Sequence, residues 1–99
     1  MFKILMFWNI RPGRGDEYFE FILQEFGPTL VKLGIQPIDA WYTYYGEGPQ
    51  ILTSGVAEDL ETVKRVLSSE EWKKLKMKLL SYVTDYEQKV VRAEGGFQL

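Results

Sequence analysis

The sequence predicts a single α+β domain in which helices cover one face of a four-stranded antiparallel sheet. Its 99 residues are enough for one compact domain, and a hydrophobic content of 45% is typical of a globular chain. Four segments predict strands, two of them dense in aromatic residues, and the two long segments between strands have apolar residues at three- and four-residue steps. We therefore expect one domain over residues 1–99.

The first strand is predicted over Phe2–Ile10, and the turn formers of Arg11–Gly15 end it. A helix begins at Asp16, because apolar residues then recur at helical spacing: Phe19, Ile22, Leu23, Phe26, Leu30 and Leu33. Pro28 has no N–H to donate, so a kink or restart is expected at Gly27-Pro28. Gly34 is a suitable residue to end the helix.

A hairpin is predicted next, with strands over Ile38–Tyr45 and Gln50–Val56 joined by the turn Gly46–Pro49. A short helix over Asp59–Leu67 follows it, with Leu60, Val63 and Leu67 on one face.

The pattern Ser68-x-x-Glu71 predicts a capping box, so a new helix is expected to start there. Its apolar stripe is Trp72, Leu75, Leu79 and Tyr82. The last strand is predicted over Tyr86–Ala93, followed by a break at Gly95-Gly96. The order β-α-β-β-α-β, with its second helix split in two, is the ferredoxin-like plan.

Both faces of the first strand are apolar, which predicts a second copy of the chain as a partner. One face carries Phe2, Ile4, Met6, Trp8 and Ile10, and the other carries Lys3, Leu5, Phe7, Asn9 and Arg11. A solvated sheet face is normally polar at alternate positions, and a large exposed apolar patch marks an interface. We therefore expect two subunits to pack sheet to sheet as a dimeric α/β barrel, and the sequence leaves open which face lines it.

Composition excludes several classes of function. Twelve basic and fourteen acidic residues give a net charge of −2, which argues against a nucleic-acid partner. The chain has no Cys and no His, which removes thiolate and imidazole catalysis and most zinc sites, so no metal or cofactor is predicted. The apolar run Ile4–Trp8 is too short for a signal peptide or a membrane helix, so we expect a soluble, cytoplasmic protein without a membrane partner.

The aromatic residues are the strongest candidates for a binding site, because aromatic side chains line apolar pockets. The predicted substrate-binding residues are Trp8, Trp41, Tyr42, Tyr45 and Trp72. Tyr and Trp also pack well on pleated surfaces, so the alternative for the strand residues is a dimer interface. For Trp72, the alternative is an anchor of the helix in the core.

Three residues are candidates for catalysis. Asn9 and Arg11 lie at the end of the first strand, where an amide and a guanidinium could stabilise an oxyanion. Tyr44 could relay a proton. The alternative is structural: Asn9 and Arg11 would cap the strand end, with the guanidinium in solvent.

The chain resembles the dimeric α/β-barrel superfamily over nearly its whole length. The strand leading into Arg11-Pro-Gly13 and then Asp16-Glu-Tyr-Phe19 is similar to the strand-to-helix connection of that superfamily. The tracts Gly48-Pro-Gln-Ile-Leu52, Glu58-Asp-Leu-Glu61 and Leu67-Ser-Ser-Glu-Glu-Trp72 resemble its NIPSNAP branch. RNA-recognition modules have the same element order, but they need aromatic residues in their third strand, which Gln50–Val56 lacks.

The resemblance implies a homodimer with an aromatic-lined pocket for a small apolar or aromatic ligand. Antibiotic-biosynthesis monooxygenases of the superfamily surround an aromatic substrate with Asn, Trp, Tyr and Arg, the types of Asn9, Trp41, Tyr44 and Arg11. This implies cofactor-independent oxygenation or isomerisation of an activated aromatic or enolisable compound. The alternative is a non-catalytic structural or ligand-sensing dimerisation module, and the sequence does not decide between the two.

Overall fold

The computed structural model describes residues 1–92 and confirms the predicted order of elements. The strands are β1 (Phe2–Ile10), β2 (Gln36–Tyr42), β3 (Ile51–Ala57) and β4 (Val83–Arg92). The first helical segment comprises α1 (Gly15–Phe21), the π-helical turn η1 (Ile22–Phe26) and α2 (Gly27–Leu33), and the second comprises α3 (Leu60–Ser68) and α4 (Glu70–Leu80). Ala93 and Gly95-Gly96, which belong to the predicted C-terminal features, lie outside the described residues.

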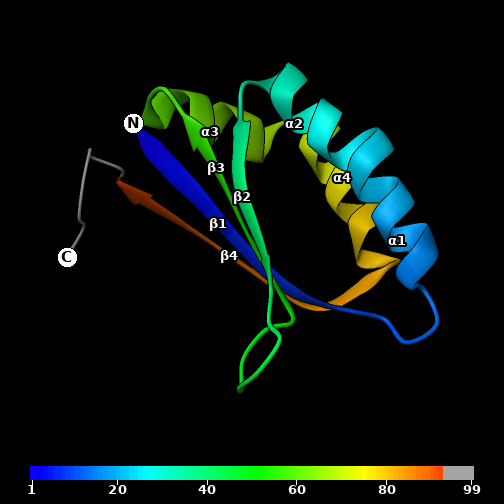
Figure 1. The fold of residues 1–99 in the computed structure, drawn as a ribbon. Coiled ribbons are helices and arrows are strands. Elements are labelled where there is room, and N and C mark those ends of the chain that lie inside the picture. The colour runs from blue at the N-terminus through cyan, green and yellow to red at the C-terminus, as the bar shows by residue number, and fades with distance from the viewer. Residues whose placement is uncertain (93–99) are drawn as a thin grey trace.

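The four strands form one antiparallel sheet in the order β2-β3-β1-β4. Both helical segments cover the same face of this sheet (Figure 1). The pairing slips once on each edge strand, between Pro37 and Asp39 on β2 and opposite Phe7/Asn9 on β4. None of the helices within residues 1–92 is long and apolar enough to cross a membrane.

The hydrophobic core lies between the helices and one face of β1. Ile4, Met6 and Trp8 are buried there, whereas Leu5 and Phe7 point to the opposite face and are half-buried. The helices contribute buried aromatic and aliphatic side chains to the same core: Tyr18, Phe21, Phe26, Leu30, Val63, Val66, Trp72, Leu75 and Leu79. The structure thus decides what the sequence left open, because the uncovered sheet face carries the Leu5 and Phe7 side of β1.

The first helical segment passes Gly27-Pro28 without a break, because the π-helical turn η1 precedes it. The Gly27 N–H donates to the carbonyl of Ile22, five residues back. The buried residues follow the same step, with Phe21 and Phe26 five positions apart on the core side. Upstream of this turn the predicted stripe is wrong by one position: Phe19 is 49% exposed, and Tyr18 is buried in its place.

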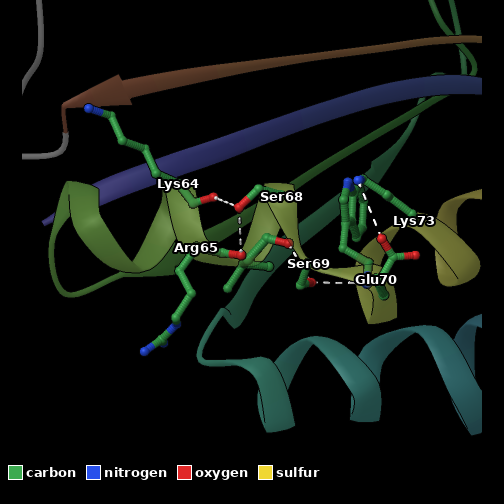
Figure 2. Close-up of polar contacts among 8 residues, drawn as sticks. Lys64, Arg65, Ser68, Ser69, Glu70 and Lys73 are labelled. Carbon is green, nitrogen blue, oxygen red and sulfur yellow. Dashed lines mark hydrogen bonds and ion pairs between the residues drawn. The ribbon is translucent and has the colours of Figure 1, made fainter.

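The split of the second helix is confirmed, but the predicted capping serine is wrong. The hydroxyl of Ser69 accepts the Trp72 N–H at 3.1 Å and so caps α4 (Figure 2). The Ser68 hydroxyl instead donates to the carbonyl of Lys64 at 2.8 Å, within α3. Since Ser68 is the last residue of α3, its side chain bonds backwards and Ser69 takes the cap.

Two strand boundaries differ from prediction by three residues, and the start of β2 and both ends of β3 differ by one or two. β2 ends at Tyr42, three residues before the predicted end, and the Thr43 hydroxyl then donates to the carbonyl oxygen of Pro49 at 2.6 Å across the turn. Tyr44 and Tyr45 therefore lie in the connection rather than in the sheet. β4 begins at Val83, three residues early, because Val83 pairs with Ile10.

Candidate functional site: a cavity between the helices and the sheet

A cavity of about 430 Å³ lies between the first helical segment and the β2–β3–β1 part of the sheet. β1 contributes Ile4, Met6 and Trp8 to its lining, and the helices contribute Tyr18, Phe26 and Leu30. The side of the cavity at β2 borders solvent, since every residue of that strand is exposed. Asp39 is the one charged residue in the described lining, so the site is built to hold apolar groups.

Trp8 forms part of the cavity wall and belongs to an aromatic cluster. The Trp8 indole is fully buried and stacks on Tyr86 at a centroid distance of 6.0 Å, with 9° between the ring planes. Phe26 meets the same indole edge-on at 5.8 Å. These contacts from β4 and η1 fix the indole in place, so the wall is preformed.

A buried hydrogen bond joins this wall to α1. The Trp8 Nε1–H donates to the Tyr18 hydroxyl at 2.8 Å. Burial raises the pKa of Tyr18 to about 12, against a smaller lowering by the hydrogen bond from Trp8. At neutral pH the Tyr18 phenol is therefore uncharged and keeps its proton.

At the exposed side, Gln50 orients the hydroxyl of Tyr42. The Gln50 Oε1 accepts the Ile10 N–H at 2.8 Å, so its Nε2 donates to the Tyr42 hydroxyl at 2.8 Å. The Gln50 N–H in turn donates to the Asn9 Oδ1 at 2.8 Å. These bonds tie the beginning of β3 to the end of β1 and hold Tyr42 beside the cavity.

The structure brings three of the five predicted substrate-binding residues together. Trp8 and Tyr42 line the cavity, and Trp41, which pairs with Leu52 and so has its side chain on the uncovered face, borders it at the exposed strand β2. Tyr45 is 95% exposed in the β2–β3 connection. Trp72 is buried on α4 and packs against Phe26 with a ring-centroid distance of 6.3 Å. It is not among the residues that line the cavity, which is the arrangement that the core-anchor alternative predicts.

The three predicted catalytic residues lie at the end of the sheet and are not among the residues that line the cavity. The Asn9 Nδ2 donates to the Asp85 Oδ2 at 3.0 Å, and the Arg11 guanidinium donates to the carbonyl of Leu80 at 3.1 and 3.3 Å. Tyr44 is 98% exposed. Their contacts match the strand-end alternative for Asn9 and Arg11, and their catalytic roles stay predictions.

Tyr18 is the polar aromatic residue of the cavity lining that the sequence does not predict as a binding residue. It lies two residues after Asp16, where the predicted helix begins, and it is one position off the apolar stripe of that helix. The signal that points to it is the spacing of aromatic residues. Tyr18 and Phe21 share a helical face, and the five-residue step to Phe26 keeps that face toward the core if a π-helical turn lies between them.

Comparison with known proteins identifies the fold. No family model and no curated protein matches the sequence. Solved structures do match: a NIPSNAP-domain protein from Burkholderia xenovorans at 13% identity covers 99% of both chains with a TM-score of 0.69. A protein from Arabidopsis thaliana, at 10% identity, covers 99% of this chain and 100% of its own with a TM-score of 0.80.

A proposed antibiotic biosynthesis monooxygenase from Deinococcus radiodurans is also similar, at 10% identity and a TM-score of 0.72 over 100% of this chain and 98% of its own. The chain has the ferredoxin-like fold of NIPSNAP-domain proteins. At these identities the likeness establishes the fold alone. The NIPSNAP-type fold confirms the predicted α+β class, the single sheet and the placement of both helical segments on one face.

Proposed function

We propose that this chain is a homodimeric barrel protein that binds a small, flat, apolar or aromatic compound in the helix–sheet cavity. The observation that carries the proposal is the cavity itself. Its volume of about 430 Å³ and its apolar lining are those of a small-molecule site. The Trp8 part of its wall is held by ring packing, so a planar ligand would meet a preformed surface.

The partner in this proposal is a second copy that packs on the uncovered sheet face. Leu5, Phe7, Leu52 and Val56 lie on that face by strand register, and each is only half-buried. An apolar sheet face of this kind needs a cover, and a second copy would bury on the order of 800 Å² on each partner in an interface of standard size. The helices, and the cavity beneath them, would stay on the outside of such a barrel.

Catalysis is the finer part of the proposal. The proposed monooxygenases among the similar structures, from Deinococcus radiodurans and Nitrosomonas europaea, support a cofactor-free oxygenase or isomerase. In that case Asn9 and Arg11 would stabilise an oxyanion, and Tyr44 would relay the proton. Because these residues are not among those that line the cavity, the geometry supports binding more directly than turnover. A non-catalytic ligand sensor is the second candidate, and the same cavity supports it.

The cavity proposal is tested by filling the cavity. Thr53 lines it from β3, so Thr53→Trp should occupy its volume and abolish binding of naphthalene, measured by fluorescence titration. Thr29→Trp on α2 is the matched control, since Thr29 is half-buried outside the lining. Both variants are first checked by circular dichroism. Undiminished binding by a folded Thr53→Trp variant would refute the cavity as the binding site.

The catalytic part has its own test. Oxygen consumption with 1,4-dihydroxynaphthalene is measured above the spontaneous rate. If the proposal holds, wild type accelerates it, and Asn9→Ala and Tyr44→Phe each lower the rate without loss of the fold. Equal rates in all three proteins would remove the roles assigned to Asn9 and Tyr44, while leaving the binding function intact.

A further inference from the structure

We infer that Tyr18 is a hydrogen-bond donor to the ligand, so that the cavity selects apolar ring compounds with an acceptor oxygen, such as aryl ketones, over hydrocarbons of the same shape. This inference rests on the proposed binding function and names the ligand class. It follows from the direction of the hydrogen bonds at the cavity wall, because that direction determines whether each hydroxyl still has a proton to donate to a ligand.

The bond between Trp8 and Tyr18 can run in one direction only. An indole N–H is a donor without an acceptor lone pair, so the Tyr18 hydroxyl must be the acceptor of the 2.8 Å contact. The phenolic proton therefore remains to be donated. Among the hydrogen bonds within residues 1–92, that contact with Trp8 is the one that the Tyr18 hydroxyl makes.

The surroundings leave the proton of Tyr18 without a protein acceptor. Tyr18 is 2% exposed, and the neighbouring rings of Trp8 and Phe19 meet it edge-on and accept no conventional hydrogen bond. A buried donor without a partner is costly, and a ligand oxygen that accepts from it removes that cost. An aryl hydrocarbon would fill the same space and leave the donor unpaired, so the donor discriminates between the two.

The other hydroxyls near the cavity are less able to discriminate. The Tyr42 hydroxyl also accepts one bond, from Gln50, but Tyr42 is 57% exposed and water can take its proton. The Thr53 hydroxyl already donates to the carbonyl of Met6, at 3.4 Å. The Ser54 hydroxyl lacks a partner and Ser54 belongs to the cavity lining, but Ser54 pairs with Leu5 in the sheet, so its side chain lies on the opposite face.

The experiment compares two probes of nearly equal shape, 2-acetylnaphthalene and 2-isopropylnaphthalene. Dissociation constants are measured by fluorescence for wild type, Tyr18→Phe, Tyr42→Phe and Tyr86→Phe. Tyr86→Phe is the matched control, because it removes a hydroxyl from the other tyrosine that contacts Trp8, and that hydroxyl bonds Gln88 outside the cavity lining. Wild type and Tyr86→Phe should prefer the ketone by about tenfold.

In Tyr18→Phe, the preference for the ketone should fall to near unity, through weaker ketone binding with hydrocarbon binding little changed. Because each variant is measured with both probes, a general loss of structure would weaken both and leave the ratio intact. A ratio that is unchanged in Tyr18→Phe, or that falls only in Tyr42→Phe, would overturn the inference while the proposed binding function stands. Failure of both probes to bind wild type would overturn the proposed function as well.

A second measurement does not depend on the folding of any variant. The carbonyl stretching frequency of bound 2-acetylnaphthalene, measured by infrared difference spectroscopy on wild type, should lie below its value in cyclohexane, because a donated hydrogen bond weakens the C=O bond. A frequency equal to that in cyclohexane would show that no donor reaches the ketone, and the inference would fail.

Discussion

Gly55 on β3 lies directly against Ile35, the residue that precedes β2. A Cβ atom at position 55 would be 2.7 Å from the Cγ2 of Ile35 and 3.3 Å from the carbonyl oxygen of Gln36. Ile35 is 1% exposed and lines the cavity with Gly55, so the close approach sets the spacing of β2 and β3 at the cavity wall.

We expect Gly55→Ala to destabilise the protein by about 1–3 kcal/mol, because Ile35 has little free space into which to move. Gly15→Ala is the matched control. Gly15 is the first residue of α1, and no atom lies within 4 Å of the methyl group that alanine would add there. The free energy of unfolding of the Gly15→Ala variant should therefore equal or exceed that of wild type. Urea unfolding at one protein concentration measures both. Equal stability of Gly55→Ala and wild type would show that the strand spacing adjusts freely.

The two serines between α3 and α4 should differ sharply in their effect on stability. Ser69→Ala removes the N-cap of α4 and should cost about 1 kcal/mol, since the Trp72 N–H loses its acceptor. Ser68→Ala removes a bond to a carbonyl one turn back within α3 and should change stability by less than about 0.5 kcal/mol. Thermal unfolding of the two variants separates them, and an equal loss in both would contradict the assignment of the cap.

Stability should fall at alkaline pH. Burial raises the pKa of Tyr18 to about 12, above its ordinary value of 10.0, and also raises the pKa of Tyr86. The stabilising contribution is complete below pH 10, because both states are then protonated. Above pH 10 the unfolded chain loses these protons while the native chain keeps them, so the free energy of unfolding falls by up to about 1.4 kcal/mol per pH unit for each tyrosine.

Urea midpoints measured from pH 8 to pH 11.5 test this dependence. Tyr18→Phe removes one of the two groups and should make the fall shallower. The same steepness in Tyr18→Phe and wild type would mean that Tyr18 is not protected from ionisation by its burial.

The proposed dimer is tested by placing a charge on the uncovered face. Leu52→Arg should convert the dimer into a monomer, because Leu52 pairs with Phe7 on that face. Leu23→Arg makes the same change at a leucine that is 75% exposed on the helical side and should leave the dimer intact. Analytical ultracentrifugation measures both. A wild-type monomer, or a dimeric Leu52→Arg variant, would rule out this face as the interface.

Periodicity was enough to predict the order of elements, because the strands and helices here differ clearly in their apolar spacing. It could not decide which face of β1 meets the helices. Ile4, Met6 and Trp8 on one side and Leu5 and Phe7 on the other are all apolar, so the local pattern is nearly the same for both. That choice is made by tertiary packing, where the larger Trp8 fills the space beneath η1.

The candidate site was only partly predictable for a related reason. Trp8, Trp41 and Tyr42 were found because large aromatic residues on strands are conspicuous. Tyr18 was not predicted, because a regular 3.6-residue period places its side chain off the core-facing stripe. The π-helical turn changes the alignment of the helical faces, so that Tyr18 lies on the core side. The roles expected of Asn9 and Arg11 were inferred from their position at the end of the first strand. The sequence gives that position, but it does not give the direction in which the two side chains point.

The irregular pairing on β2 and β4 has a consequence for how copies of this chain can associate. Open sheet edges present unpaired N–H and C=O groups, along which sheets can extend into ladders. On β2 the pairing slips beside Pro37, which has no N–H to offer a neighbouring strand, and on β4 it slips beside Asp85, which has a φ of 55°. Both borders of the sheet are thus poor templates for another strand. These interruptions disfavour edge-to-edge growth into ladders, which leaves the uncovered face as the surface through which the proposed dimer would form.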